Sequence, residues 1–166
     1  MSFISSLGLA NPSNRFSQSA IADFMIRTLR MDGNDAARLR ALYRATGIES
    51  RYSVLDDYGR EDKFTFYGNE QELEPFPTTL DRLKVFRKSA VDLSVQSAKA
   101  CLSKSKSIRA TDITHLIVVS CTGMYAPGLD IDLLHALELR SDVQRTCITF
   151  MGCYAAFNAL KLADSF

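Results

Sequence analysis

The length and charge of this sequence set the first limits on what it encodes. Its 166 residues fit one domain or one lobe of a larger one. Apolar residues make up 46% and charged residues 23%, which is typical of a globular protein rather than a disordered one. Twenty basic and nineteen acidic side chains leave a net charge of +1, so no bulk charge favours nucleic acid or a membrane surface.

Cysteine usage and the N-terminus indicate the compartment. No two cysteines form a CxxC pair, and no histidine lies at metal-ligand spacing from any of them, which indicates free thiols in a reducing compartment. The opening residues, MSFISSLGLANPSNR, lack the basic region of a signal peptide. No apolar run approaches the roughly 18 residues of a membrane span. The sequence therefore predicts a soluble, cytoplasmic protein. The cysteines are Cys101, Cys121, Cys147 and Cys153.

The first half of the chain predicts two helices and a long connection. Apolar residues at helical spacing predict one helix over 17–29 and a second that includes 39–46. Gly47 is expected to end the second helix, because glycine readily adopts positive φ. Residues 48–77 show no steady period and are rich in carboxylates, so the acidic part, 56–74, is predicted to form a solvated surface.

The second half predicts a layered α/β fold. One apolar face marks a long helix over 78–104, and the β-branched run ITHLIVVS at 113–120 suits a strand buried on both faces. A helix is expected over 131–138, a second strand over 146–151, and a helix over 153–163 that is apolar on nearly every side. This order of elements favours a largely parallel sheet between layers of helices.

Cys153 is the residue whose position most suggests chemistry. It comes directly after the second strand and Gly152, where the last helix begins. Backbone N–H groups and the positive end of the helix dipole would face its sulfur and favour the thiolate. A sharp turn from strand to helix also offers the nucleophile's own N–H as an oxyanion donor. From position alone, a plain core cysteine remains the alternative.

Four segments in a fixed order connect the chain to a known family. They are TCITFMGCYAA at 146–156, ITHLIVVSCTGMYAPG at 113–128, LRSDVQR at 139–145 and RATGIESRY at 44–52. They resemble segments of type III polyketide synthases, the chalcone and stilbene synthase family. In the same order, the matching segments of that family are the nucleophile segment, the strand with its PG loop, the link between these two, and the TGIxxR-like stretch. The last stretch is shared with the related ketoacyl synthase III enzymes. The resemblance runs from about Leu39 to the last residue.

This resemblance implies a fold and a reaction. The fold is thiolase-like, with two duplicated α/β halves stacked in an αβαβα sandwich, and residues 1–166 would be most of the N-terminal half. The reaction is a decarboxylative Claisen condensation: a cysteine thiolate takes an acyl group from acyl-CoA, and the carbanion from malonyl-CoA attacks it. The implied partners are acyl-CoA, malonyl-CoA and a second subunit of a homodimer. No metal or bound redox cofactor is implied, nor any nucleic acid or membrane.

Individual positions carry over from the family by their motifs. Cys153 matches the nucleophile. Thr122 matches a small hydroxyl residue that lines the active-site cavity, and Cys121 lies beside it. Arg51 matches the arginine of the TGIxxR-like stretch, near the CoA entrance. The pair at 127–128, Pro-Gly, matches the PG turn near the dimer interface.

Three positions depart from the plant members of the family. Ala126 stands where plant members have a methionine that reaches into the partner subunit, and a methyl group cannot make that reach. Ala156 and Phe157 replace the paired glycines that follow the plant signature, which favours a bacterial branch. The resemblance therefore does not carry a choice of starter substrate.

The sequence lacks the rest of the catalytic set. The family's catalytic His and Asn belong to its second half, and the chain ends at Phe166. His115 matches a histidine in the family's THLI stretch and is interpreted as a core or cap residue, while His135 is expected on a face away from the chemistry. We therefore predict that this is the front half of a synthase and that it is inactive alone.

Two other functions remain as alternatives. The first is a non-catalytic thiolase-like lobe that serves as a scaffold or binding partner, although it would leave the apolar helix at 154–163 bare. The second is a simple cysteine hydrolase, for which no histidine is placed as a base for Cys153.

Overall fold

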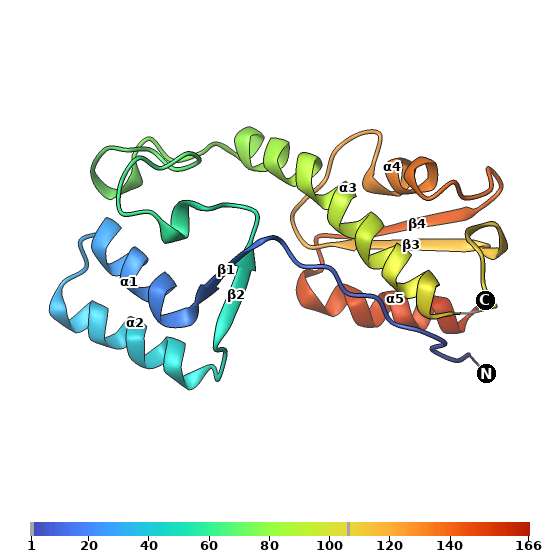
Figure 1. Cartoon of the computed structure of the whole chain (residues 1–166), viewed down its shortest axis with the longest axis horizontal. Helices are drawn as coiled ribbons and strands as arrows, with labels where there is room; N and C mark the ends of the chain where they lie inside the picture. Colours follow the sequence, from blue (N-terminus) through green and yellow to red (C-terminus); the bar gives the residue numbers. More distant parts are fainter. Residues whose placement is uncertain (1, 106) are drawn as a thin grey trace. The chain divides into compact units, whose positions relative to one another are not determined.

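A computed structural model describes residues 2–105 and 107–166 (Figure 1). The chain divides into two compact units. Unit 1 comprises Met1–Ala10 and Asp81–Phe166, and unit 2 comprises Asn11–Leu80.

The helices of unit 2 begin and end at the signals present in the sequence. The Ser17 hydroxyl accepts a hydrogen bond from Ala20 N at 3.0 Å and caps α1 (Gln18–Thr28). The N-cap of α2 (Gly33–Ala45) is Asp32, and Gly47 follows that helix with φ of 67°. Both predicted helices are confirmed. The sequence did not predict the antiparallel pair of short strands, β1 (Asn14–Ser17) and β2 (Ser50–Ser53).

Aromatic rings form the core of unit 2. Phe24 on α1 is 1% exposed, and its ring packs against those of Tyr58, Phe64 and Tyr67, with centroids 5.2, 5.6 and 6.2 Å away. Tyr58 belongs to a short 3₁₀ turn, Asp57–Gly59. The long connection thus folds back over α1 instead of trailing through solvent.

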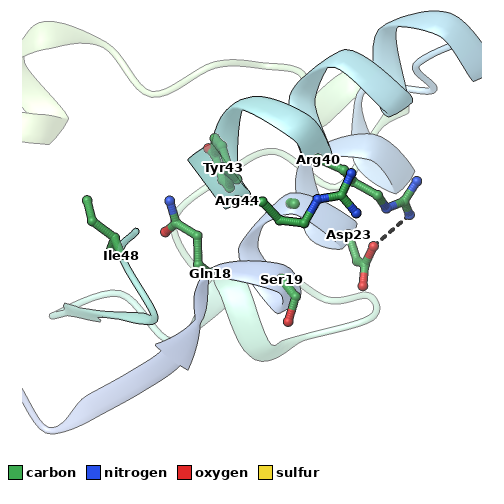
Figure 2. A pocket seen from close by; sticks show the side chains of 8 residues that line it. Gln18, Ser19, Asp23, Arg40, Tyr43, Arg44 and Ile48 are labelled. Atoms are coloured by element: carbon green, nitrogen blue, oxygen red, sulfur yellow. Dashed lines mark hydrogen bonds and ion pairs between the residues drawn. The ribbon is translucent and has the colours of Figure 1, made fainter. Parts of the chain in front are cut away.

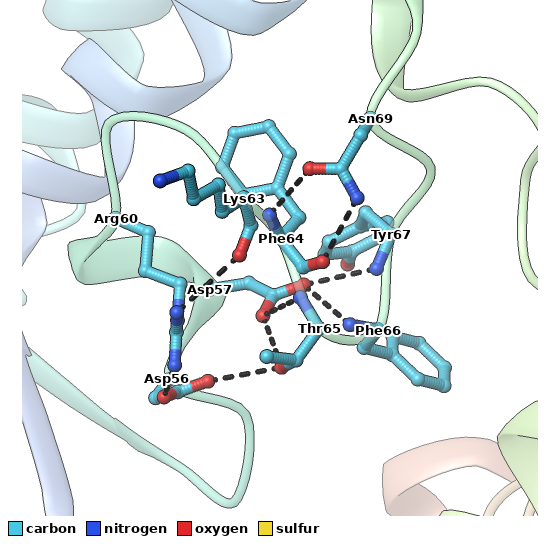
Figure 3. A network of polar contacts seen from close by, with 9 residues as sticks. All are labelled: Asp56, Asp57, Arg60, Lys63, Phe64, Thr65, Phe66, Tyr67 and Asn69. Carbon is cyan, nitrogen blue, oxygen red and sulfur yellow. Dashed lines mark hydrogen bonds and ion pairs between the residues drawn. The ribbon is translucent and has the colours of Figure 1, made fainter.

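The prediction that the acidic connection is a solvated surface is wrong at Asp57. This side chain is fully buried, and Figure 3 shows its carboxylate surrounded by donors. It accepts hydrogen bonds from Thr65 N, Thr65 Oγ1, Phe66 N and Tyr67 N at 2.7–2.9 Å. Burial alone would raise the pKa of Asp57, but the hydrogen bonds from Thr65, Tyr67 and Phe66 outweigh it, and the pKa lies below its usual value.

Unit 1 is an α/β layer structure built around two parallel strands. Strand β3 (His115–Ser120) pairs in parallel with β4 (Gln144–Thr149), which confirms the predicted parallel sheet, and the register runs from His115 opposite Gln144 to Ser120 opposite Thr149. The second strand ends two residues earlier than predicted, because Phe150 adopts φ of 59° and leaves the ladder. The helices are α3 (Thr79–Lys104), α4 (Leu129–Ala136) and α5 (Ala155–Asp164).

The core of unit 1 lies on one face of these strands. Val118 packs there with Leu133 of α4, and Val95 of α3 packs against the same cluster. Helix α5 lies along the other side of the strands (Figure 1). The prediction that the first strand is buried on both faces is wrong, since Val119 on the α5 side is 38% exposed. Among the described residues, no helix is both long and apolar enough to cross a membrane.

Candidate active site

The candidate residues of unit 1 gather at one edge of the sheet. Ser120 is paired with Thr149, so the segments that follow these two residues leave the sheet side by side. Cys121 and Thr122 follow β3 directly, and Cys153 comes four residues after β4. The parallel register therefore brings these three candidates to the carboxyl edge of the sheet.

Cys153 lies in the tight turn that leads into α5. The turn is a 3₁₀ helix, Gly152–Tyr154, and it continues without a break into Ala155. Gly152 has φ of 58°, a conformation in which a Cβ would be strained, so this position favours glycine. Ala155 is fully buried and anchors the turn. Cys153 itself is exposed and forms no disulfide. The arrangement presents a free thiol at the start of a helical segment.

Polar contacts hold the loop that follows β3. Ser120 Oγ donates a hydrogen bond to Gly123 O at 2.6 Å. Tyr125 OH donates to Asp132 Oδ2 at 2.5 Å, and the guanidinium of Arg87 lies 5.0 Å from the centroid of the same ring. Burial and the Asp132 carboxylate both raise the pKa of Tyr125, so the phenol stays protonated as the donor.

A small cavity of about 160 Å³ lies between this loop and the sheet. The sequence analysis did not predict this cavity. The alternation of side chains along a strand could have indicated part of it, because it puts Val118 and Ser120 of β3 on one face with Cys147 and Thr149 of β4. Burial and the neighbouring Asp130 carboxylate raise the pKa of the Cys147 thiol. The lining residues are Phe86, Val118, Ser120, Gly123, Met124, Tyr125, Gly128, Leu129, Cys147 and Thr149.

Gly123 is needed because α3 comes close to the loop there. A Cβ at Gly123 would lie 2.3 Å from the ring of Phe86. We expect Gly123→Ala to destabilise the protein by about 1–3 kcal/mol, since the ring or the loop must move. Gly33→Ala is the matched control, because a Cβ at Gly33 meets nothing within 4 Å. Thermal unfolding of both variants is the measurement, and an unchanged midpoint in Gly123→Ala would contradict the close contact.

Neither histidine lies at the carboxyl edge. His115 is the first residue of β3, about 16 Å of strand away from Ser120, and its ring stacks on that of Phe166 at 3.9 Å between centroids. His135 is at the end of α4, which crosses back from the carboxyl edge toward the start of β4. A base for Cys153 is thus not supplied by these two residues. The described residues also contain no cluster of three or more His, Cys, Asp or Glu side chains that could hold a metal ion.

Arg51 belongs to unit 2 and is described with it. It lies on β2, and its Nε donates a hydrogen bond to Oε1 of Gln18 at 2.9 Å. Gln18 is 5% exposed, so a buried amide fixes the direction of an exposed guanidinium.

Solved structures of known proteins share this fold. Polyketide synthase PKS-I of the brown alga Ectocarpus siliculosus is 30% identical, with a TM-score of 0.78 over 98% of this chain and 43% of that one. The C-terminal type III polyketide synthase domain of Steely1 from Dictyostelium, at 24% identity, also gives a TM-score of 0.78. The chain therefore has the thiolase-like fold of type III polyketide synthases, over their N-terminal portion.

The family follows from the sequence comparisons. The family model for chalcone and stilbene synthases, N-terminal domain, matches residues 1–166, and the chain belongs to this family. Type III polyketide synthase C of Arabidopsis thaliana is 31% identical over 95% of this chain and 40% of its own length. The polyketide synthase-like protein Pks18 of Mycobacterium tuberculosis is 31% identical over 98% and 39%. The chain spans about 40% of the length of these relatives, and the resemblance found in the sequence is confirmed.

Proposed function

We propose that the protein to which this chain belongs is an acyltransferase that makes polyketides, with Cys153 as its nucleophile. One observation carries the proposal: in a chain of the chalcone and stilbene synthase family, an exposed free thiol stands on the tight turn between a parallel strand and a helix. A nucleophile needs access and a fixed orientation, and this turn supplies both.

The proposed reaction has two covalent steps. The Cys153 thiolate attacks the thioester carbonyl of the starter acyl-CoA, an S-acyl bond forms on Cys153, and CoA leaves as its thiolate and takes up a proton. Malonyl-CoA then loses CO₂, and the resulting carbanion attacks the acyl carbonyl and expels the Cys153 thiolate. Developing negative charge on oxygen needs donors in both steps. Cys121, Thr122 and Arg51 are proposed to contribute to substrate binding.

The remaining catalytic groups are proposed to come from a C-terminal half outside these 166 residues. The surface around Cys153 supports an additional covering element, because large apolar side chains lie bare there. Phe150 is 67% exposed, Phe157 60% and Leu160 58%. Exposed apolar surface of this kind is typical of an interface. We propose that the rest of the protein and a second subunit of a homodimer together cover this apolar surface.

Acyl loading tests the proposal directly. Protein from the native gene is incubated with an aromatic and with a long-chain acyl-CoA, and its intact mass is recorded before and after. We expect a gain of one acyl group, found by peptide mapping on Cys153 and not on the other three cysteines. A protein that gains no acyl group from either donor would favour the non-catalytic lobe instead.

A further inference from the structure

Helices α1 and α2 of unit 2 enclose a small pocket, and Gln18, the hydrogen-bond partner of Arg51, is one of the residues that line it (Figure 2). Its volume is about 190 Å³, which is below the size of most sites for drug-sized ligands and suits a small molecule. The two helices run in opposite directions, so the start of α1 and the end of α2 meet at the pocket. The lining residues are Gln18, Ser19, Ala22 and Asp23 of α1, Arg40, Tyr43 and Arg44 of α2, and Ile48.

The pocket carries one uncompensated positive charge. Arg40 is paired with Asp23, with 2.7 Å between guanidinium nitrogen and carboxylate oxygen, so these two charges cancel. Arg44 forms no ion pair with any residue that the structure describes. The positive end of the α1 dipole adds to the same potential, and the first turn of α1 holds no acidic residue to offset it.

Gln18 contributes a hydrogen-bond donor that has no acceptor. Its orientation is fixed, because Oε1 accepts a hydrogen bond from Arg51 Nε and an arginine can only donate. The other end of the amide, Nε2, is buried and has no hydrogen-bond partner among the described residues. Figure 2 shows this nitrogen directed toward the space between Tyr43 and Ile48. A buried donor without an acceptor is rare in folded proteins and calls for an explanation.

We propose that this pocket binds a small organic monocarboxylate. A carboxylate supplies an acceptor for Gln18 Nε2 and one negative charge for Arg44, while the walls formed by Ala22, Tyr43 and Ile48 suit an apolar body. A phosphate dianion would leave excess negative charge beside Asp23 and would not use these walls. Gln18 Nε2 is closed off from solvent, so a flanking side chain must turn before a carboxylate can reach it. The flanking side chain that we expect to turn is Ile48, which is 39% exposed. The proposal does not rest on the synthase reaction, although Gln18 also holds Arg51.

Calorimetric titration of the protein from its native gene tests this site, with hexanoate and inorganic phosphate as separate probes at constant ionic strength. We expect hexanoate to bind and phosphate not to bind. Arg44→Gln should raise the Kd for hexanoate at least tenfold, since it removes the unpaired charge from an exposed position. Gln18→Glu should do the same, because it keeps an acceptor for Arg51 but fills the pocket with a carboxylate of its own.

Arg38→Gln is the matched control. Arg38 is on the same helix, its side chain is 82% exposed, and it pairs with Asp35 instead of lining the pocket. Its Kd for hexanoate should stay within twofold of the unmodified protein. Three results would each overturn the proposal. The first is phosphate binding as tightly as hexanoate, with the same loss of affinity in Arg44→Gln. The others are hexanoate binding that Arg44→Gln leaves unchanged and the absence of hexanoate binding.

Discussion

Replacing Cys153 with alanine is expected to lower polyketide formation by about 10⁴-fold or more, because removing a covalent nucleophile leaves only binding and oxyanion stabilisation. Cys153 is exposed and lies in a turn held by its backbone, so the substitution should leave the free energy of unfolding within about 0.5 kcal/mol. The measurement is product formed from a starter acyl-CoA and malonyl-CoA by protein from the native gene.

Cys101→Ser is the control for this experiment. Cys101 is also a free thiol, but it lies on α3, is only partly exposed and hydrogen bonds to Ser6 at 3.0 Å. This variant should keep its rate within about twofold, since a hydroxyl can make the same contact. Product formation by Cys153→Ala at the rate of the unmodified protein would rule out Cys153 as the nucleophile.

Local patterns explain why the layered part of the fold could be predicted. A β-branched run defines β3, alternating apolar residues mark β4, and regular apolar spacing defines the helices, so each element is specified within its own sequence. The candidate nucleophile could be found for the same reason, since Gly152 and Cys153 are neighbours in the chain. The positions of Cys121 and Thr122 at the same edge then follow from the parallel pairing alone.

Features that depend on distant residues could not be predicted. Strands β1 and β2 have four residues each, too few for a period, and each is defined by its partner some 35 positions away. Asp57 stands among acidic residues most of which are exposed, with nothing in its own sequence to set it apart. Its burial arises from the backbone of residues 65–67, which comes to it only when the connection folds.

The second large effect that we expect is on stability, at Asp57. Asp57→Ala would remove the acceptor of four hydrogen bonds, three of them from backbone N–H groups (Figure 3). Part of the loss is recovered by water, because Thr65 is exposed. We expect a cost of about 2–4 kcal/mol and faster amide hydrogen exchange at Phe66 and Tyr67. Asp62→Ala, an exposed neighbour on the same connection, should change stability by less than about 0.5 kcal/mol.

The pH dependence of Asp57 has a definite sign. Its pKa in the folded protein is lowered, so its contribution to stability is fully present above the unfolded value of about 3.9 and is lost as the pH falls through the folded pKa. Asparagine cannot titrate, so the unfolding free energy of Asp57→Asn lacks this dependence. The difference between Asp57→Asn and the unmodified protein should be constant from about pH 5 to 7 and shrink below pH 4. A difference that grows as the pH falls would mean that the carboxylate is protonated in the fold, and that its hydrogen bonds with Thr65, Phe66 and Tyr67 are not what holds the connection.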